Sequence, residues 1–188
     1  MGEDLKKQWI LAGYEVFALQ GPHALKVEVL SRMVGKNKSS FYHHFADLEV
    51  FTEFLLHYHL ERAEVIAAEE KRCNNVDPEL LEVLVNNKID LLFNRQLRFH
   101  RRVPAFEKCF KKTSEYAAEA VLGIWAEAIG LTENTKLAFA VLMLSLENFY
   151  LQITEETLHY KWLSAYVKNL RNMVDEFKRI GEQATTKL

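Results

Sequence analysis

Apolar residues recur along most of the chain at the three- and four-residue spacing that places side chains on one face of a helix. The first such stripe consists of Leu5, Trp9, Ala12, Val16 and Leu19. It predicts a helix over residues 4–20. Gly21 and Pro22 end this helix, glycine as a left-handed stop and proline as a residue that cannot continue it. No segment alternates with the period of two that is typical of a half-buried strand, so the pattern predicts an all-α protein.

Two short helices are predicted next, at about residues 26–33 and 38–44. Gly35 ends the first of them, because glycine readily adopts the left-handed conformation that closes a helix. Asn37 is a good N-cap for the second, because its side chain can accept a hydrogen bond from a free backbone N–H. The two helices are therefore joined by a tight turn.

The remainder of the chain is predicted to be helical as well. Asp47 is the expected N-cap of a long helix, and Asn74-Asn75 breaks it. Asp77-Pro78 restarts the chain as an N-cap followed by proline at the first helical position. With the three N-terminal helices, six further ones make roughly nine in all. Their expected ranges are about 48–72, 79–95, 99–110 with a bend near Pro104, 114–129, 133–154 and 159–182.

The last two helices carry an unusual amount of apolar surface. Residues 137–146 are largely apolar all round, which is typical of a helix buried on every side. The final helix carries a seam with 4-3-4-3 spacing, wide enough for two neighbours. In a chain this short a second copy can supply one neighbour, so the sequence predicts a homodimer through the helices at about 133–154 and 159–182. The alternative is that both helices pack in the core of a monomer. The seam consists of Leu163, Val167, Leu170, Val174 and Phe177.

Composition narrows the class of protein. The 188 residues carry 24 Lys and Arg against 26 Asp and Glu, and 49% are hydrophobic, which excludes a disordered chain. Cys73 and Cys109 are too few for a disulfide scaffold and are expected to be reduced, with a sensing role for either left open. The N-terminus is polar, and the longest apolar run is eight residues where a bilayer crossing needs about 20. We therefore expect a cytoplasmic protein without a membrane segment.

Positive charge is concentrated around the two short helices. Residues 26–44 contain four basic residues against the single acid Glu28, whereas residues 1–60 as a whole contain six basic and seven acidic residues. Two short helices that cross at a glycine-containing turn are typical of a helix-turn-helix, whose second helix can enter the major groove of DNA. The exposed side of that helix would carry polar groups able to bind base edges or phosphates. These groups are Lys38, Ser39, Ser40, Tyr42 and His43.

At this point the sequence resembles the TetR family of transcriptional regulators. The aromatic signature of that family appears as FYHHF at residues 41–45, and the resemblance covers about residues 5–51. It implies an N-terminal three-helix DNA-binding domain at 1–47 and a C-terminal helical ligand-binding and dimerisation domain at 48–188. The remaining matching positions are Ala12, Val16, Phe17, Ala18, Gly21, Val27, Leu30, Gly35, Ser40, Glu49 and Phe51.

The resemblance also implies roles for single residues. Tyr42 and His44 correspond to phosphate contacts, and Phe41 and Phe45 to packing residues that hold the two short helices together. Leu48 stands where the family often has a phosphate-binding lysine. The groove-facing positions are those of Lys38, Ser39, Ser40 and His43. Lys26 stands where the family usually has a capping threonine that touches phosphate, and Lys36 is a candidate for the contact that Leu48 cannot make.

The resemblance implies a repressor that a small molecule releases from a palindromic operator in double-stranded DNA. Aromatic and sulfur-containing side chains are dense across residues 93–150, and some of them are expected to line a pocket for a small apolar or amphipathic effector. A run of arginines at residues 95–102 is either a solvated face or an anion contact at the mouth of that pocket. The expected pocket residues are Phe99, Phe106, Phe110, Trp125, Met143, Glu147 and Tyr150.

Two rival interpretations remain open. In the first, the same N-terminal DNA-binding domain is controlled by a partner protein instead of a small molecule. The second rival interpretation is a metal-binding helical bundle enzyme, because Glu156 and His159 form an E-x-x-H pair. A di-iron bundle needs two such pairs and two further glutamates, and only one pair is present. The sequence contains no recognisable nucleophile triad, phosphate loop or C-x-x-C pair, so we expect no enzyme activity, cofactor or metal.

Overall fold

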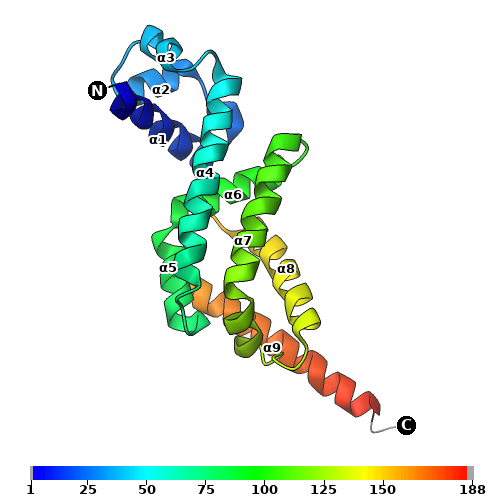
Figure 1. The fold of residues 1–188 in the computed structure, drawn as a ribbon. Helices are drawn as coiled ribbons and strands as arrows, with labels where there is room; N and C mark the ends of the chain where they lie inside the picture. Colours follow the sequence, from blue (N-terminus) through cyan, green and yellow to red (C-terminus); the bar gives the residue numbers. More distant parts are fainter. Residues whose placement is uncertain (1, 186–188) are drawn as a thin grey trace. The chain divides into compact units, whose positions relative to one another are not determined.

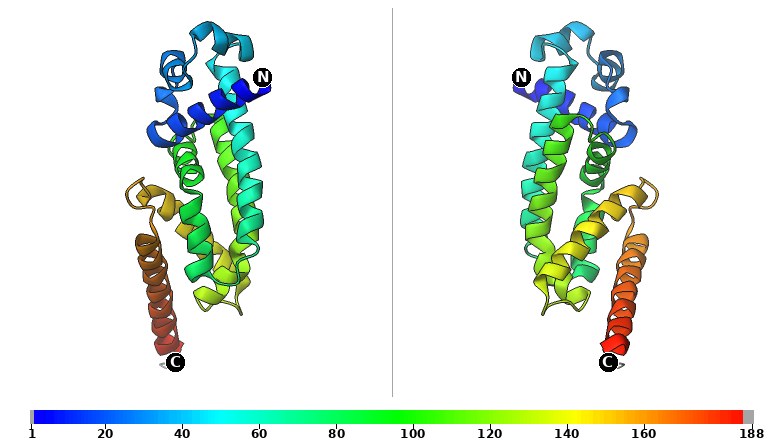
Figure 2. Two further views of the ribbon diagram at one scale, coloured as in Figure 1. Left: turned by 90° about the vertical axis from the view of Figure 1, so that its left-hand side faces the viewer. Right: turned by 90° about the vertical axis from the view of Figure 1, so that its right-hand side faces the viewer.

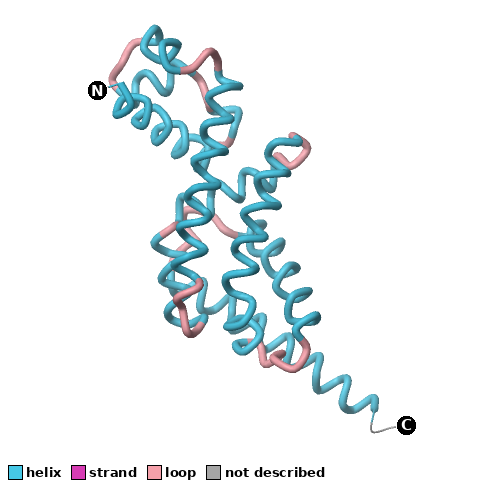
Figure 3. Tube along the Cα trace, viewed as in Figure 1, coloured by secondary structure: helices cyan, strands magenta, loops and turns pink. Residues whose placement is uncertain are grey.

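The structure is a computed structural model that describes residues 2–185. Within that range it consists of helices and connecting loops without a strand (Figures 1 and 3), so the predicted all-α class is confirmed. None of the described helices is long and apolar enough to cross a membrane. The first four α-helices are α1 (Gly2–Gln20), α2 (Val27–Val34), α3 (Lys38–His44) and α4 (Leu48–Glu70). The others are α5 (Leu81–Asn86), α6 (Lys88–Phe99), α7 (Pro104–Ala128), α8 (Thr135–Gln152) and α9 (Tyr160–Thr185).

The chain divides into two compact units. The first comprises Met1–Val65 and Asn87–Tyr116, and the second comprises Ile66–Asn86 and Ala117–Leu188. Of the three boundaries, two fall inside the long helices α4 and α7, so each of these helices contributes residues to both units, and the third falls between α5 and α6. The domain boundary predicted between residues 47 and 48 stays a prediction.

Aromatic side chains hold the N-terminal helices of the first unit together. Phe41 lies on α3, Phe45 is the C-cap residue of this helix, and the two side chains are 0% and 1% exposed. The Phe41 ring meets Trp9 of α1 edge to face at 5.4 Å and Phe51 of α4 at 5.2 Å. A side chain at Gly13 would place its Cβ 2.4 Å from Phe51, so glycine permits the close approach of α1 to α4. Figure 2 shows α1, α2 and α3 gathered about the first half of α4.

The predicted signals between these helices act as expected, with one exception. Gly35 ends α2 with φ 66°, and the Asn37 side chain accepts a hydrogen bond from the Ser40 N–H at 2.9 Å. Asp47 accepts from the Val50 N–H at 2.8 Å at the start of α4. Gly21, however, is not a left-handed helical stop: its φ of 84° is positive, but its ψ of 174° lies far from the left-handed helical region, and a short 3₁₀ turn, η1 (Pro22–Ala24), follows. Only glycine adopts that conformation readily.

The middle of the chain differs from the sequence prediction in three places. The expected N-cap Asp77 does not cap a helix: Asn75 does so, accepting a hydrogen bond from the Glu79 N–H at 3.2 Å, because the Asp77 carboxylate is bonded to Tyr160 and Ser164.

The single helix expected at 79–95 is a π-helical turn, η2 (Val76–Leu80), followed by α5 and α6, which Asn87 separates with φ −106° and ψ 32°. The Asn87 side chain accepts a hydrogen bond from Arg62, a tertiary contact that the local sequence pattern does not predict.

Conversely, the helices expected at 99–110 and 114–129 are one helix, α7. Pro104 does not bend it but starts it, because proline has a helical φ and lacks the N–H that would be unpaired at that position. Thr113 does not interrupt it either, since its hydroxyl donates to the carbonyl of Phe110 within the same helix.

In the second unit, the start of α9 is tied to the turn before α5. Tyr160 and Ser164 both donate hydrogen bonds to the carboxylate of Asp77, the second at 2.6 Å. Helix α8 does not meet the expectation that it is buried on every side, because Leu144 is 72% exposed and Phe139 is 46% exposed. A single chain supplies too few neighbours to cover all its faces.

Candidate nucleic-acid interface

Helix α3 presents its polar side to solvent. Burial of Phe41 and Phe45 fixes the inner side of this helix, and the opposite side is therefore turned outward. Tyr42 is 54% exposed, and His43 beside it is also exposed. Of the eight residues predicted to contact DNA, Ser40 and His44 are half-buried. The six exposed ones are Lys26, Lys36, Lys38, Ser39, Tyr42 and His43.

A cation from α1, Lys6, lies near the C-terminal end of α3 and acts on His44 there. The Lys6 ammonium lies 3.8 Å from the centre of the Phe54 ring, a cation–π contact that brings it to this end of α3. Burial lowers the pKa of His44, and the neighbouring His43 and Lys6 lower it further. Both effects favour the neutral form of the His44 imidazole over its charged form. The sequence prediction did not include Lys6, because nothing in the helical pattern of residues 4–20 distinguishes it from other exposed lysines.

Lys26 and Lys38 hold different local positions. Lys26 is the N-cap residue of α2 and makes no side-chain capping bond, since an ammonium cannot accept one. Lys38, the first residue of α3, donates from Nζ to the carboxylate of Glu28 on α2. Both partners are more than half exposed, and the hydrogen bond from Lys38 lowers the pKa of Glu28. The sequence located both charges but did not predict their pairing, which crosses the turn of the helix-turn-helix.

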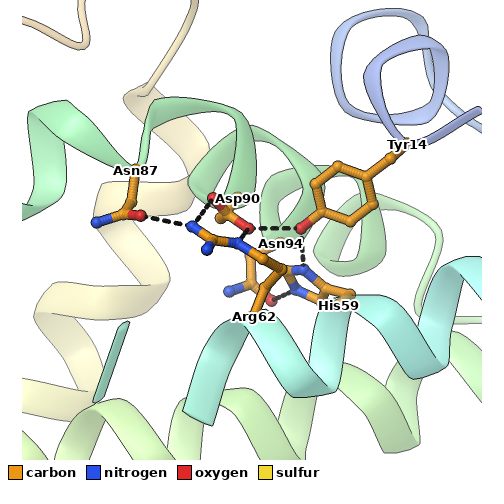
Figure 4. A network of polar contacts seen from close by, with 6 residues as sticks. All are labelled: Tyr14, His59, Arg62, Asn87, Asp90 and Asn94. Carbon is orange, nitrogen blue, oxygen red and sulfur yellow. Dashed lines mark hydrogen bonds and ion pairs between the residues drawn. The ribbon is translucent and has the colours of Figure 1, made fainter. Parts of the chain in front are cut away.

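A buried polar network lies elsewhere in the first unit and was not predicted at all (Figure 4). Its centre is Asp90 on α6, which accepts from the Tyr14 hydroxyl at 2.8 Å and from Arg62 at 3.1 and 3.2 Å. The Tyr14 oxygen also lies 2.5 Å from Nδ1 of His59, whose Nε2 donates to Asn94 at 3.0 Å. The network therefore joins α1, α4 and α6.

The ionisation of this network follows from burial. Burial lowers the pKa of His59 to about 4, so its imidazole is neutral at pH 7. Burial and the nearby Asp90 raise the pKa of Tyr14, so its phenol keeps its proton. A neutral His59 that donates from Nε2 leaves Nδ1 as an acceptor, and the single Tyr14 proton then serves both Nδ1 and Asp90. Periodicity could not reveal this arrangement, because each residue by itself fits an ordinary helix surface.

The expected effector residues fall into both units. Phe106 packs edge to face against Phe17 at 5.4 Å in the first unit, where Phe99 is 43% exposed under the Arg95 guanidinium. Phe110, also in the first unit, is buried. In the second unit Trp125 and Tyr150 are buried, and Met143 and Glu147 are half-buried. Their common role in one pocket stays a prediction.

Sequence reasoning missed one residue of the second unit that is chemically unusual. Glu70, at the end of α4, is 5% exposed, and its Oε2 has no hydrogen-bond partner among the described residues. Burial raises the pKa of this carboxyl to about 8. The indole N–H of Trp125 is likewise buried without a partner. Neither feature has a signal in the sequence, because both depend on which neighbours cover the side chain.

The residues considered for metal binding and thiol chemistry have ordinary surroundings. Nδ1 of His159 accepts from the backbone N–H of Trp162 at 3.3 Å, at the start of α9. Within residues 2–185, no group of three or more His, Cys, Asp or Glu side chains is placed to hold a metal ion. Burial raises the pKa of Cys109 to about 12 and also raises that of Cys73, which disfavours the reactive thiolate form of both.

Comparison with known proteins shows which fold this is. No family model and no curated protein matches the sequence. Solved structures do match, and they show that the chain has the all-α fold of TetR-family transcriptional regulators, with an N-terminal helix-turn-helix and a C-terminal helical bundle. The predicted fold class is thereby confirmed.

Three solved structures illustrate the likeness. GusR from Salmonella enterica is 14% identical with a TM-score of 0.59, and the match covers 91% of this chain and 93% of that one. A TetR-family transcriptional regulator from Rhodococcus sp. is 17% identical with a TM-score of 0.57, covering 92% and 97%. One from Mesorhizobium loti is 14% identical with a TM-score of 0.54, covering 92% and 98%.

Proposed function

We propose that this chain is a sequence-specific DNA-binding transcriptional regulator. The observation that carries the proposal is the two-sided character of α3, with Phe41 and Phe45 buried and Tyr42 and His43 turned to solvent. A short helix with a packed inner side and a polar outer side can enter the major groove and bind base edges and phosphates. The fold shared with known regulators supports the same function.

We assign roles to the exposed residues accordingly. Tyr42 and His44 contact phosphates, and Lys26 and Lys36 add positive charge beside the backbone. Residues 1–47 form the DNA-binding part, and residues 48–188 form the effector-binding and dimerisation part. The residues that face the groove are Lys38, Ser39, Ser40 and His43.

We propose that the protein acts as a homodimer through α8 and α9. Both helices carry large apolar side chains in water, with Leu144 72% exposed on α8 and Phe177 65% exposed on α9. Apolar surface of this kind marks interaction sites. A second copy also supplies the two recognition helices that a palindromic operator requires, about 34 Å apart. The other large hydrophobic residues exposed on the described parts of these helices are Leu137, Phe139, Leu151, Tyr160, Met173 and Ile180.

Substitution of Leu144 by glutamate should weaken self-association at least tenfold. Twofold symmetry places the change in both copies, and burying each leucine contributes roughly 1.5–3 kcal/mol. Sedimentation over a range of concentrations measures the effect. Leu11→Glu is the matched control, since Leu11 is a 43% exposed leucine on α1. A dimer that tolerates Leu144→Glu as well as it tolerates Leu11→Glu would place the interface elsewhere.

We further propose that the protein is a repressor released by a small apolar or amphipathic effector. Tyr14 of α1 is hydrogen-bonded to His59 of α4 and Asp90 of α6. An effector that shifts α4 or α6 therefore changes the position of α1. Glu70 Oε2 and Trp125 Nε1 have no hydrogen-bond partner among the described residues, so the polar end of a ligand can satisfy them. To lower DNA affinity a hundredfold, the effector must bind the conformation with low DNA affinity more favourably than the conformation with high DNA affinity, by about 2.7 kcal/mol. DNA affinity that is unchanged by a tightly bound effector would refute this release.

Removing one hydroxyl from α3 tests the DNA-binding function. In the variant Tyr42→Phe the ring keeps its edge contact with Phe41, so only the hydroxyl is lost. Loss of a hydrogen bond to a charged phosphate should weaken binding about tenfold or more. The operator is first selected from random duplexes, and affinity is then measured by fluorescence anisotropy. Tyr116→Phe on α7 removes a comparable hydroxyl and should leave DNA affinity intact. Equal affinities for both variants would argue against the assignment, and failure to select any duplex would refute DNA binding.

A further inference from the structure

The pair formed by Glu28 and Lys38 lies on the face that carries the proposed DNA contacts. Lys38 opens α3, and Glu28 lies in the first turn of α2, so the pair bridges the two helices of the motif. Their side chains are 60% and 55% exposed. Lys26, another proposed DNA contact, also acts electrostatically on the Glu28 carboxyl. A carboxylate therefore stands among the cations that would meet the phosphate backbone.

We infer that Glu28 is a specificity-determining residue that keeps Lys38 from binding phosphate indiscriminately. This inference rests on the proposed DNA-binding function. A carboxylate that already holds the Lys38 ammonium competes with any phosphate for it. It also repels the backbone, so DNA of arbitrary sequence loses one cation and gains one anion in the contact surface.

The pair opens only where the DNA offers better partners than the pair itself. In the major groove, a lysine ammonium donates to the O6 and N7 acceptors of guanine, and a carboxylate accepts from the N4 amino group of cytosine. A guanine and a cytosine within reach of the two side chains can satisfy both at once. Phosphate can satisfy Lys38 only and leaves Glu28 unpaired. Glu28 therefore lowers affinity for arbitrary DNA more than it lowers affinity for the operator.

The salt dependence of binding measures how many cations meet phosphates. Each phosphate neutralised by a lysine or arginine contributes about −0.9 to the slope of log affinity against log salt concentration. If Glu28 keeps Lys38 from phosphate, Glu28→Gln should steepen the slope for non-operator DNA by about 0.9. Affinity for that DNA should rise a few-fold, and the ratio of operator to non-operator affinity should fall.

A double-mutant cycle separates this role from a general change in charge. The variants are Glu28→Gln, Lys38→Met and the double variant, each titrated with a non-operator duplex and with the selected operator over a range of salt concentrations. For the non-operator duplex, the slope of the double variant should be shallower than that of Glu28→Gln by about 0.9. The slope of Lys38→Met should differ from that of the wild-type protein by clearly less. Glu49→Gln, which removes another exposed carboxylate of the first unit, should leave the effect of Lys38→Met as it is.

Each outcome of the cycle decides the question. Non-additive slopes, together with a lower specificity ratio in Glu28→Gln, support the assigned role. Additive slopes would overturn it and would leave the DNA-binding function in place, since charge alone would then explain each substitution. A wild-type protein that binds neither duplex would overturn both the function and this inference. Both residues are exposed, so thermal unfolding should verify that every variant folds.

Discussion

Substitution of Asp90 by alanine is expected to lower the free energy of unfolding by about 3 kcal/mol. Its side chain is only 10% exposed and accepts hydrogen bonds from the Tyr14 hydroxyl and the Arg62 guanidinium. Among the described residues, removing the carboxylate leaves the Tyr14 phenol with only Nδ1 of His59 as a partner and the Arg62 guanidinium with only Asn87. Breaking a pair of this kind typically costs about 3–5 kcal/mol, and the 31% exposure of Arg62 places the expected value at the lower end.

Urea denaturation followed by circular dichroism measures this loss from the shift in midpoint. Asp175→Ala on α9 is the matched control, because Asp175 is exposed and its replacement should change stability by less than about 0.5 kcal/mol. Similar midpoints for the two variants would mean that the network contributes little to stability. The substitution should also reduce DNA affinity. Asp90 helps to hold α1 in place through Tyr14, and α3 packs against α1 through the contact between Phe41 and Trp9.

Substitution of Glu70 by glutamine is expected to stabilise the protein strongly at alkaline pH. The pKa of this carboxyl is about 8 in the folded state against a usual value of 4.5, so the folded state binds a proton that the unfolded state releases. Stability of the wild-type protein therefore falls as pH rises from about 4.5 to 8. The full penalty, on the order of 5 kcal/mol, is reached above that range. Glutamine cannot ionise and removes the penalty.

Thermal unfolding measured between pH 5 and pH 9 tests this expectation. Wild type and Glu70→Gln should be similar at pH 5, and the variant should unfold at a clearly higher temperature at pH 9. The control Glu127→Gln removes an exposed carboxylate of the second unit and should follow the wild-type curve. Parallel curves for wild type and Glu70→Gln would show that Glu70 is ionised and satisfied in the folded protein. If a cationic effector binds at Glu70, it should lose affinity in the same variant.

Local signals in the sequence were sufficient for the helix-turn-helix. Gly35 and Asn37 define its turn through a left-handed backbone and a capping bond, both of which depend on a few adjacent residues. Phe41 and Phe45 are four residues apart, which already places them on one side of α3 and leaves Tyr42 and His43 outside that side. The sequence therefore predicted both the motif and its exposed chemistry.

Local signals failed where a distant side chain decides the backbone. Asn87 separates α5 from α6 while its side chain binds Arg62, which lies 25 residues earlier in the chain. Pro104 is a different case, because no distant side chain is involved: proline fits the first turn of a helix as well as a bend, and here it starts α7.

The sequence by itself determined the helical class, the limits of the N-terminal helices and the polar outer side of α3, because these follow from spacing and from contacts a few residues apart. Only the tertiary structure decided the Asp90 network, the pairing of Glu28 with Lys38, the burial of Glu70 and the exposure of Leu144. Each of these depends on which segments, distant in sequence, come to lie within a few ångströms of one another. A helical period records which side of a helix is buried, but it does not record which side chain will meet it there.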